Sequence, residues 1–340
     1  ERLKAIVTCI LEIQERLQDI CRSSSSDINN NINIRNVQQL ISDFRAKFSI
    51  DYETLQLDQI CIHLLSPWIE NILAKTWQDP LRSPHQVALF VDQWRTILGD
   101  KENNIALSIL ISKHLLPKLK KTFGGRWDIV ESSQSVLALY KACKTSFAVV
   151  ADTGDEDEED IRQEIGVPTD VDKTLCNILN DTIAPKLHRA VVSAWRPHRR
   201  RKKELIEEVV PIHSWLLPWL AYLDDSTKTA LLNEVFRKFR RAFLQSSSDP
   251  HHKDVASWYS SNDEALQMLI PWKGVADDEM MESLIRESIA PQLALLLSTK
   301  LKINPSNQDL MPIHQVLLWY NAGLLRTFQL ICLFDGIILL

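Results

Sequence analysis

The chain has 340 residues, of which 45% are hydrophobic and 24% are charged, a balance typical of a folded protein with a sizeable core. Its formal net charge of -5 excludes a molecule that is basic throughout, so any contact with nucleic acid has to come from a local basic patch. Only eight glycines are present, and they form no cluster of the kind that wraps a phosphate group.

The N-terminal part of the sequence reads as a series of amphipathic helices. Residues 1–21 place apolar side chains at helical spacing, with Glu and Arg residues between them. The Ser- and Asn-rich residues 22–36 predict a loop, and the pair Ser66-Pro67 predicts a break in a helical segment. The predicted helical segments of this part cover residues 1–21, 36–48, 51–76, 85–98, 103–123 and 127–150.

Residues 151–170 interrupt this pattern with a run of acidic residues between 152 and 160. The run has no apolar partner, so self-repulsion and solvation predict a loop or the soft end of a helix. It also lacks the spaced Asp, Asn and Gly residues of an EF-hand, which argues against a calcium loop.

Helical periodicity resumes after the acidic segment. No period-2 alternation is sustained anywhere in the chain, and no Asn-Gly or Asp-Gly hairpin joins two β-branched runs. The sequence therefore predicts an all-α fold. The predicted helical segments here cover 171–195, 226–244, 255–275, 277–301 and 311–318, with polar loops at 245–254 and 302–309.

The segment 211–219 is the most unusual, because it contains two tryptophans and two prolines. Pro211 suits the entry of a helix, where its missing N–H costs nothing. Pro218 predicts two short helical pieces that meet at a bend. Trp215 and Trp219 are four residues apart and lie on one face if the helix continues. The simplest interpretation of such a cluster is core packing.

Three short motifs recur along the chain, and two of them repeat at nearly equal offsets of 106 and 101 residues. The two motifs therefore recur as a pair with a nearly constant spacing, as in a duplicated helical unit. Such units predict an elongated array of stacked helix pairs, with prolines that kink the helices at the same place in each unit. The motifs are Pro-Trp at 67–68, 218–219 and 271–272, Pro-[Lys/Gln]-Leu at 117–119, 185–187 and 291–293, and Pro-Ile-His at 211–213 and 312–314. The residues to which we assign this structural role are Pro211, His213, Trp215, Pro218, Trp219, Pro271 and Trp272.

These motifs, taken in order and with their spacings, resemble the GCFC-type helical domain of the tuftelin-interacting protein family. The resemblance is strong over about 175–322 and weaker over 40–150. After Leu318 the family usually continues with a further Pro-Lys-Trp-type helix, which residues 324–340 do not follow. The segments that carry the resemblance are Ile183–Leu187, Val210–Leu220, Leu269–Lys273, Ile289–Leu293 and Ile303–Pro305.

The resemblance implies a non-enzymatic protein of pre-mRNA splicing in the nucleus, with no cofactor. Family members associate with the intron-lariat spliceosome and bring in a DEAH-box RNA helicase for its disassembly. The Gly-rich G-patch that recruits the helicase is absent from these 340 residues, so we expect it to lie outside this chain. The implied role is a docking body for spliceosomal proteins of the late complex.

The predicted organisation has four parts. Residues 1–150 form an N-terminal helical part, 151–170 an acidic loop, 171–322 the core GCFC-like repeats and 323–340 a divergent apolar C-terminal helix. This last segment is too short and too interrupted by charge to cross a membrane, and we expect no membrane contact. Because the chain starts at Glu1 without a leader, we expect it to be part of a longer protein.

Two basic runs are candidate contact sites. Arginine forks and lysine charges suit phosphate oxygens, and such contacts are independent of base sequence and sensitive to salt. No aromatic ladder accompanies either run, which argues against base readout. The sequence leaves three interpretations open: a solvated face paired with local acids, a surface for RNA or for an acidic partner, and a nuclear import signal. The candidate residues are Arg196, Arg199, Arg200, Arg201, Lys202 and Lys203, followed by Arg237, Lys238, Arg240 and Arg241.

No catalytic or metal-binding motif is present in the sequence. The adjacent His251 and His252 have no HExxH context and no paired cysteines, so no metal site is expected. His213 and His314 occupy equivalent repeat positions, which favours a bonding or capping role over catalysis. No GxSxG, Walker loop or carboxylate pair of suitable spacing occurs. The six cysteines form no CxxC pair and read as reduced core residues of an intracellular protein: Cys9, Cys21, Cys61, Cys143, Cys176 and Cys332.

Overall fold

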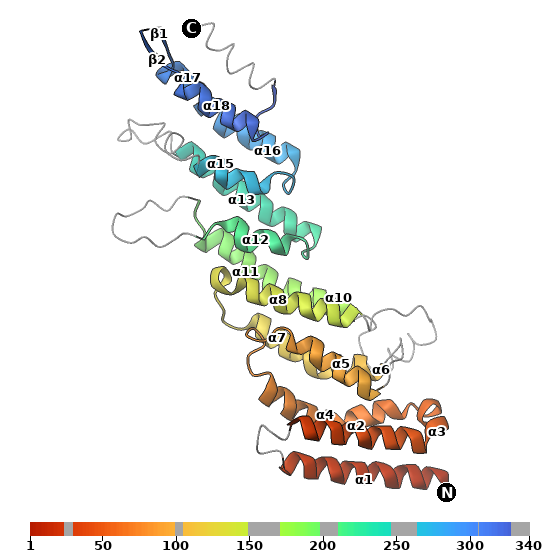
Figure 1. Ribbon diagram of the computed structural model, residues 1–340. Helices are drawn as coiled ribbons and strands as arrows, with labels where there is room; N and C mark the ends of the chain where they lie inside the picture. Colours follow the sequence, from red (N-terminus) through yellow and green to blue (C-terminus); the bar gives the residue numbers. More distant parts are fainter. Residues whose placement is uncertain are drawn as a thin grey trace. The chain divides into compact units, whose positions relative to one another are not determined.

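The computed structural model describes residues 1–23, 30–98, 105–148, 171–197, 210–245, 264–304 and 306–327, and nearly all of them are helical (Figure 1). The all-α prediction is confirmed. The chain divides into two compact units, Glu1–Pro185 and Lys186–Leu340, and each is described by itself. The acidic run at 152–160, the basic residues 199–203, the pair His251-His252 and the end of the tail at 328–340 lie outside the described residues.

Unit 1 consists of helices joined by short connections. Along the chain α1 contacts α2 and α4, α2 contacts α5, α5 contacts α8, and α8 contacts α10 (Figure 1). Neighbouring helices thus bury their apolar stripes against one another, as amphipathic sequences require. The elements are α1 (Arg2–Ser23), α2 (Asn30–Lys47), α3 (Ser49–Thr54), α4 (Leu57–Thr76), α5 (Gln86–Leu98), α6 (Ile105–Leu110), η2 (Ile111–Leu115), α7 (Leu116–Gly124), α8 (Ile129–Ala148), α10 (Val171–Ile178) and η3 (Leu179–Ile183).

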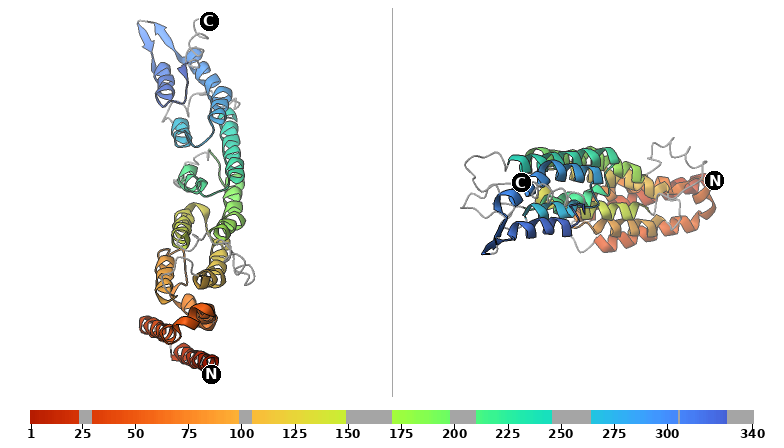
Figure 2. Two further views of the ribbon diagram at one scale, coloured as in Figure 1. Left: turned by 90° about the vertical axis from the view of Figure 1, so that its right-hand side faces the viewer. Right: turned by 90° about the horizontal axis from the view of Figure 1, so that it is seen from above.

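Unit 2 is built around the long helix α13 (Asp225–Gln245), which contacts η4, α16 and η6. A short antiparallel hairpin of β1 (Lys302–Asn304) and β2 (Asn307–Asp309) follows α17 (Figure 2), and α17 packs on α18. The remaining elements of this part are α11 (Ala184–Arg189), η4 (Ala190–Ala194), α12 (Ile212–Leu220), α15 (Glu264–Leu269), η5 (Ile270–Trp272), α16 (Asp278–Leu284), η6 (Ile285–Ile289), α17 (Ala290–Lys300) and α18 (Met311–Asn321).

Aromatic side chains form the centre of unit 2. The fully buried Trp272 meets the rings of Phe236 and Phe239 edge-on, at centroid distances of 6.3 and 6.1 Å. Phe239 in turn stacks on Phe243 and receives the edge of Trp195. Such pairs add about 0.5–1.5 kcal/mol each beyond the burial of apolar area, so this cluster fixes α13 against its neighbours.

Two predicted helix breaks at proline are wrong. Helix α4 runs without interruption through Pro67, and α12 is one helix through Pro218 instead of two pieces at a bend. Both prolines are exposed, so each ring faces solvent, whereas the tryptophan that follows each proline is buried. Burial of Trp68 and Trp219 directly after these prolines outweighs the loss of one helical hydrogen bond, which is about 3 kcal/mol with the accompanying clash.

Two predicted loops also differ from the structure. Helix α2 begins at Asn30, inside the predicted loop 22–36, because its buried Val37 and Ile41 anchor a helix that extends past the Asn-rich segment. Intrinsic propensity is a weak prior that such packing overrides. Within the predicted polar loop 302–309, residues 302–304 and 307–309 pair as the β1–β2 hairpin.

Candidate functional site

The segment 211–219 is buried in unit 2 by its apolar side chains. Pro211 lies just before α12 in an extended conformation, as the helix entry requires, and Trp215 and Trp219 are both buried. His213 is half-buried, and burial lowers the pKa of its imidazole. His314 is exposed, and a bonding or capping role for the two histidines stays a prediction. The tryptophans serve packing.

Each Pro-[Lys/Gln]-Leu triplet follows a five-residue π-helical segment that ends two residues before the proline. The segments are η2 before Pro117, η3 before Pro185 and η6 before Pro291. In each one, the residue before the proline donates its N–H to the carbonyl five residues earlier. A proline cannot make the usual helical bond and its ring crowds the carbonyl four residues back, and a π turn accommodates both. The repeat is therefore a repeat of backbone geometry, while kinking at these prolines remains a prediction.

The residue after the proline caps a neighbouring helix. Lys118 donates from Nζ to the carbonyl of Leu73 in the last turn of α4 at 2.6 Å, with its charge 5.5 Å from the ring of Trp77. Gln292 donates from Nε2 to the carbonyl of Phe243 in the last turn of α13, also at 2.6 Å. Each contact supplies a side-chain donor to a carbonyl in the last turn of a helix, where partners within the helix run out. The carbonyl of Leu73 also accepts the N–H of Trp77, at 3.3 Å. Lys186 stands at the third such position, and burial, with Arg189 beside it, lowers the pKa of its amine.

Lys238, one of the candidate contact residues, is used inside the fold. Its side chain lies against the C-terminal end of η4 and donates from Nζ to the carbonyls of Val191, Val192 and Trp195 at 2.6, 2.7 and 2.8 Å. Only 8% of the residue is exposed, and the ammonium lies 5.8 Å from the ring centre of Trp195. All three donors of an ammonium group are thereby satisfied by the protein.

The other basic candidates on α13 have mixed surroundings. Arg237 is exposed and pairs with Glu234 through two short bonds, which lower the pKa of that carboxyl. Arg240 donates to Ser283 and pairs with Glu287 at 3.4 Å. Arg241 is exposed. The sequence run 237–241 is thus divided among a core contact, two ion pairs and one exposed arginine.

Arg196 is the described member of the first basic run, and it is exposed beside the end of η4. Its guanidinium donates to the carbonyls of Val192 and Trp195, at 3.4 and 3.2 Å. Together with Arg237 it lies close enough to Lys238 for both charges to lower the pKa of that amine, after burial as the larger cause. Arg196 and Lys238 therefore converge on the same helix end.

A buried histidine joins two helices in unit 1. Nε2 of His114, in η2, lies 2.9 Å from the hydroxyl of Ser66, and Nδ1 lies 3.6 Å from a carboxylate oxygen of Glu70, both on α4. Burial lowers the pKa of His114, Glu70 opposes this shift and Lys113 adds to it. The order hydroxyl, imidazole and carboxylate occurs in hydrolases, but a reactive site also needs an oxyanion pocket. Because both ring nitrogens of His114 face α4, we interpret the group as a polar contact between helices.

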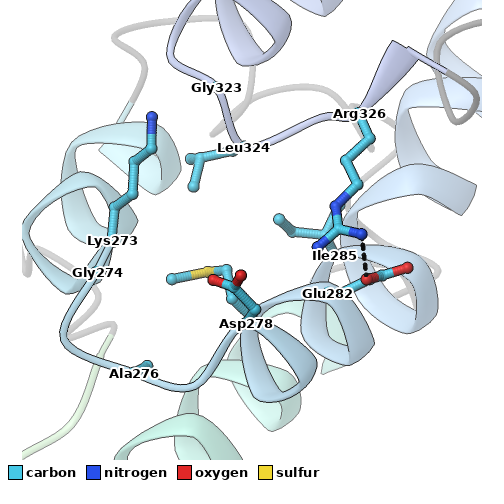
Figure 3. Close-up of a pocket in the computed structure, with 10 residues that line it drawn as sticks. Lys273, Gly274, Ala276, Asp278, Glu282, Ile285, Gly323, Leu324 and Arg326 are labelled. Atoms are coloured by element: carbon cyan, nitrogen blue, oxygen red, sulfur yellow. Dashed lines mark ion pairs between the residues drawn. The ribbon is translucent and has the colours of Figure 1, made fainter.

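A cavity in unit 2 lies between α16 and the end of α18 and has a volume of about 90 Å³ (Figure 3). Its walls come from the turn before α16, from α16 and η6, and from the chain after α18. The sequence prediction missed this site. The sequence feature that could have indicated it is the pair Gly274 and Gly323, because a glycine just past a helix marks a left-handed cap. The lining residues are Lys273, Gly274, Ala276, Asp278, Met281, Glu282, Ile285, Gly323, Leu324 and Arg326.

Within the described residues no group of three or more His, Cys, Asp or Glu side chains is arranged to hold a metal ion. None of the described helices combines the length and the apolar character that crossing a membrane would need.

Comparison with known proteins places the sequence motifs in a family context. Residues 171–338 match the family model described as GCFC, GC-rich sequence DNA-binding factor-like protein. The matched region covers α10 to α18 and includes both the segment 211–219 and the cavity of Figure 3.

Curated relatives extend the similarity over most of the chain. The septin and tuftelin-interacting protein 1 homolog of Dictyostelium discoideum is 21% identical over 310 residues, which cover 86% of this chain and 29% of the relative. Tuftelin-interacting protein 11 of Xenopus laevis is 23% identical over 319 residues, 94% of this chain and 33% of the relative. The same protein of Xenopus tropicalis is 30% identical over 145 residues, 43% of this chain and 15% of the relative. The chain thus spans at most about a third of the length of these relatives.

Proposed function

Because the chain is homologous to the tuftelin-interacting proteins and its residues 171–338 match the GCFC family model, we propose that it is a non-enzymatic helical scaffold of pre-mRNA splicing. In this role it docks on the intron-lariat spliceosome and supports helicase-driven disassembly. The observation that carries the proposal is the similarity to these relatives over nearly the whole chain.

The use of the repeated motifs supports a scaffold role. Lys118 and Gln292 donate hydrogen bonds to carbonyls at the ends of neighbouring helices, and Trp219 and Trp272 lie in the core. The motif residues thus build the body, and docking is left to the outward faces of its helices. An interface made in this way buries side chains that are exposed in the free chain.

The partners and the location belong to the same proposal. We expect the chain to meet spliceosomal proteins of the late complex in the nucleus. A DEAH-box RNA helicase would be reached through a G-patch outside these 340 residues.

Direct RNA binding through the basic runs is the competing proposal. The exposed Arg196 and Arg241 favour it, since arginine suits phosphate oxygens. The guanidinium of Arg196 also donates to the carbonyls of Val192 and Trp195, at 3.4 and 3.2 Å. Lys238 adds nothing to such a surface, and Arg237 and Arg240 are already paired with acids. The described part of this surface is therefore smaller than the sequence run suggests, and we keep RNA contact as the second candidate.

Pull-down of the purified chain from nuclear extract at low and at high salt distinguishes the two. The scaffold proposal predicts recovery of late-spliceosome proteins together with intron-lariat RNA, resistant to high salt. Recovery of mixed RNA that washes off with salt would favour the second candidate, because phosphate contacts release counterions. The double variant Arg196→Glu and Arg241→Glu is the matched control: it abolishes RNA recovery only if the second candidate is correct.

A further inference from the structure

The cavity of Figure 3 has an apolar floor. Ala276, Met281, Ile285 and Leu324 line it, and each is buried in the fold except where it faces this space. A cavity of about 90 Å³ is smaller than the ~150 Å³ cavity that holds a benzene molecule, so it has room for the branched end of one aliphatic side chain. The floor thus offers a place for a single apolar group.

The two rims of the cavity are fixed by left-handed glycines. Gly323 has a φ of 68° and ends α18: its N–H bonds to the carbonyl of Tyr320, and the next N–H bonds to that of Trp319. These two bonds form a Schellman cap. Gly274 on the opposite rim has a φ of 77°. Both glycines hold conformations that other residues rarely adopt, so the rims are shaped by the backbone.

Lys273 ties the rims together. Its Nζ donates to the carbonyl of Ala322, the residue before Gly323, at 3.0 Å. A Cβ added at Gly323 would collide with this amine, so the glycine is also needed for the close approach of the lysine. The cavity is consequently a built feature of unit 2, with opposite walls joined by a hydrogen bond.

Among the charged groups that line the cavity, the carboxylate of Asp278 is the one without a described bonding partner. Arg326 and Glu282 pair at 3.2 Å on one wall, and the amine of Lys273 is engaged by Ala322. Asp278 lies between these walls with its carboxylate toward the cavity (Figure 3). It is exposed, and across the described ranges of the chain it has no hydrogen bond or ion pair. The neighbouring Asp277 is exposed too, so this rim is negative.

We propose that this cavity is a docking site for a protein segment that presents an aliphatic side chain beside a lysine or arginine. The aliphatic group fills the floor formed by Met281, Ile285 and Leu324, and the basic group pairs with Asp278. An apolar centre with a polar rim is the usual anatomy of a protein interface. The chain's own residues 328–340 are apolar but contain no Lys or Arg, so charge complementarity selects a partner over this segment. The inference concerns recognition chemistry and stands apart from the splicing role.

Methyl-detected NMR on the full chain tests this directly. The probe is the capped dipeptide acetyl-Leu-Arg-amide, and acetyl-Leu-Glu-amide is the charge-inverted control. We expect saturable shifts confined to the methyl groups of Ala276, Met281, Ile285 and Leu324, with a Kd on the order of 1–10 mM. The Glu probe is expected to bind about two- to fivefold more weakly, the range of an exposed ion pair.

Variants of Asp278 separate the contribution of its carboxylate to probe binding from that of the apolar floor. Asp278→Asn removes the preference for the Arg probe, and Asp278→Lys reverses it in favour of the Glu probe. Asp277→Asn, which changes the neighbouring acid outside the lining, keeps the original preference. Shifts spread over distant methyl groups, or equal binding of both probes by the unmodified chain, would overturn the proposal. So would NOE contacts between Met281 and methyl groups beyond Thr327 that persist at saturating probe, since the chain would then fill its own cavity.

Discussion

Two regions of unit 2 use charge in opposite ways. Lys238 belongs to a basic run that the sequence marks as a contact surface, yet three carbonyls at the end of η4 take up its ammonium group inside the fold. Asp278 belongs to an ordinary acidic first turn of a helix, yet its carboxylate remains available beside a cavity. The comparison teaches that two factors decide whether a charged side chain is used inside the fold or stays available to a partner. They are the direction in which the side chain leaves its helix and its distance from the end of a neighbouring helix.

The largest effect is expected at Lys238. The substitution Lys238→Met keeps the length of the side chain and removes three hydrogen bonds at the end of η4, of which the one to Val191 is buried. Unit 2 should therefore lose about 3 kcal/mol of unfolding free energy. Arg241→Met, three residues further along α13 and exposed, should stay within about 0.5 kcal/mol of the unmodified chain. Urea denaturation followed by Trp fluorescence measures both. Equal losses for the two variants would show that Lys238 is not a structural group.

The next largest effect is expected at Gly323, because this residue shapes one rim of the cavity beside Asp278. Gly323→Ala forces a side chain into a left-handed conformation and against Lys273, and should cost about 1–2 kcal/mol and close the cavity to the dipeptide probe. The control is Gly124→Ala at the end of α7, where a Cβ meets nothing within 4 Å. This control should be neutral or slightly stabilising. A neutral Gly323→Ala would contradict the description of the cap.

Lys118 extends the comparison to unit 1. Lys118→Met removes the donor to Leu73 at the end of α4 and should cost about 1 kcal/mol, whereas the exposed Lys120→Met two residues on should change little. Hydrogen exchange of the last turn of α4 adds a local readout. We expect faster exchange there in the first variant only. Unchanged exchange in both would remove the capping role of the Pro-Lys-Leu triplet.

The smallest expected effect is the pH dependence from His114. Its pKa lies below the usual value of the free side chain, about 6.5, so the unfolded state binds more protons than the folded state in the window between the two values. Stability should therefore fall as the pH drops from about 6.5 through that window. Of the surrounding groups, Glu70 opposes the shift, Lys113 reinforces it and the hydroxyl of Ser66 contacts the ring. His114→Gln should flatten this part of the profile.

Much of the fold could be predicted from helical periodicity, and the errors have a common cause. The sequence predicted breaks at Pro67 and Pro218 because local rules disfavour proline inside a helix, but the burial of the following tryptophans is a tertiary effect. The π segments before Pro117, Pro185 and Pro291 accommodate a local constraint of the proline, but local rules do not decide whether a helix meets that constraint with a π turn or with a break.

The candidate sites were harder to predict than the fold. The run 237–241 is visible in the sequence, but only the placement of η4 beside α13 shows that Lys238 points inward. The cavity depends on the approach of Lys273 to Ala322, 49 residues further along the chain. Local sequence patterns describe single helices well. The buried Lys238 and the cavity could not be predicted from them, because both arise where helices distant in the sequence meet.

Binding of the purified chain to isolated spliceosomes tests the central claim most directly. The comparison is between intron-lariat complexes and complexes stalled before the first splicing step, each before and after nuclease digestion of accessible RNA. A protein-docked scaffold predicts binding to the late complex that survives nuclease and high salt, with little binding to the early one. Equal binding to both complexes, or loss of binding after nuclease treatment, would contradict the scaffold account.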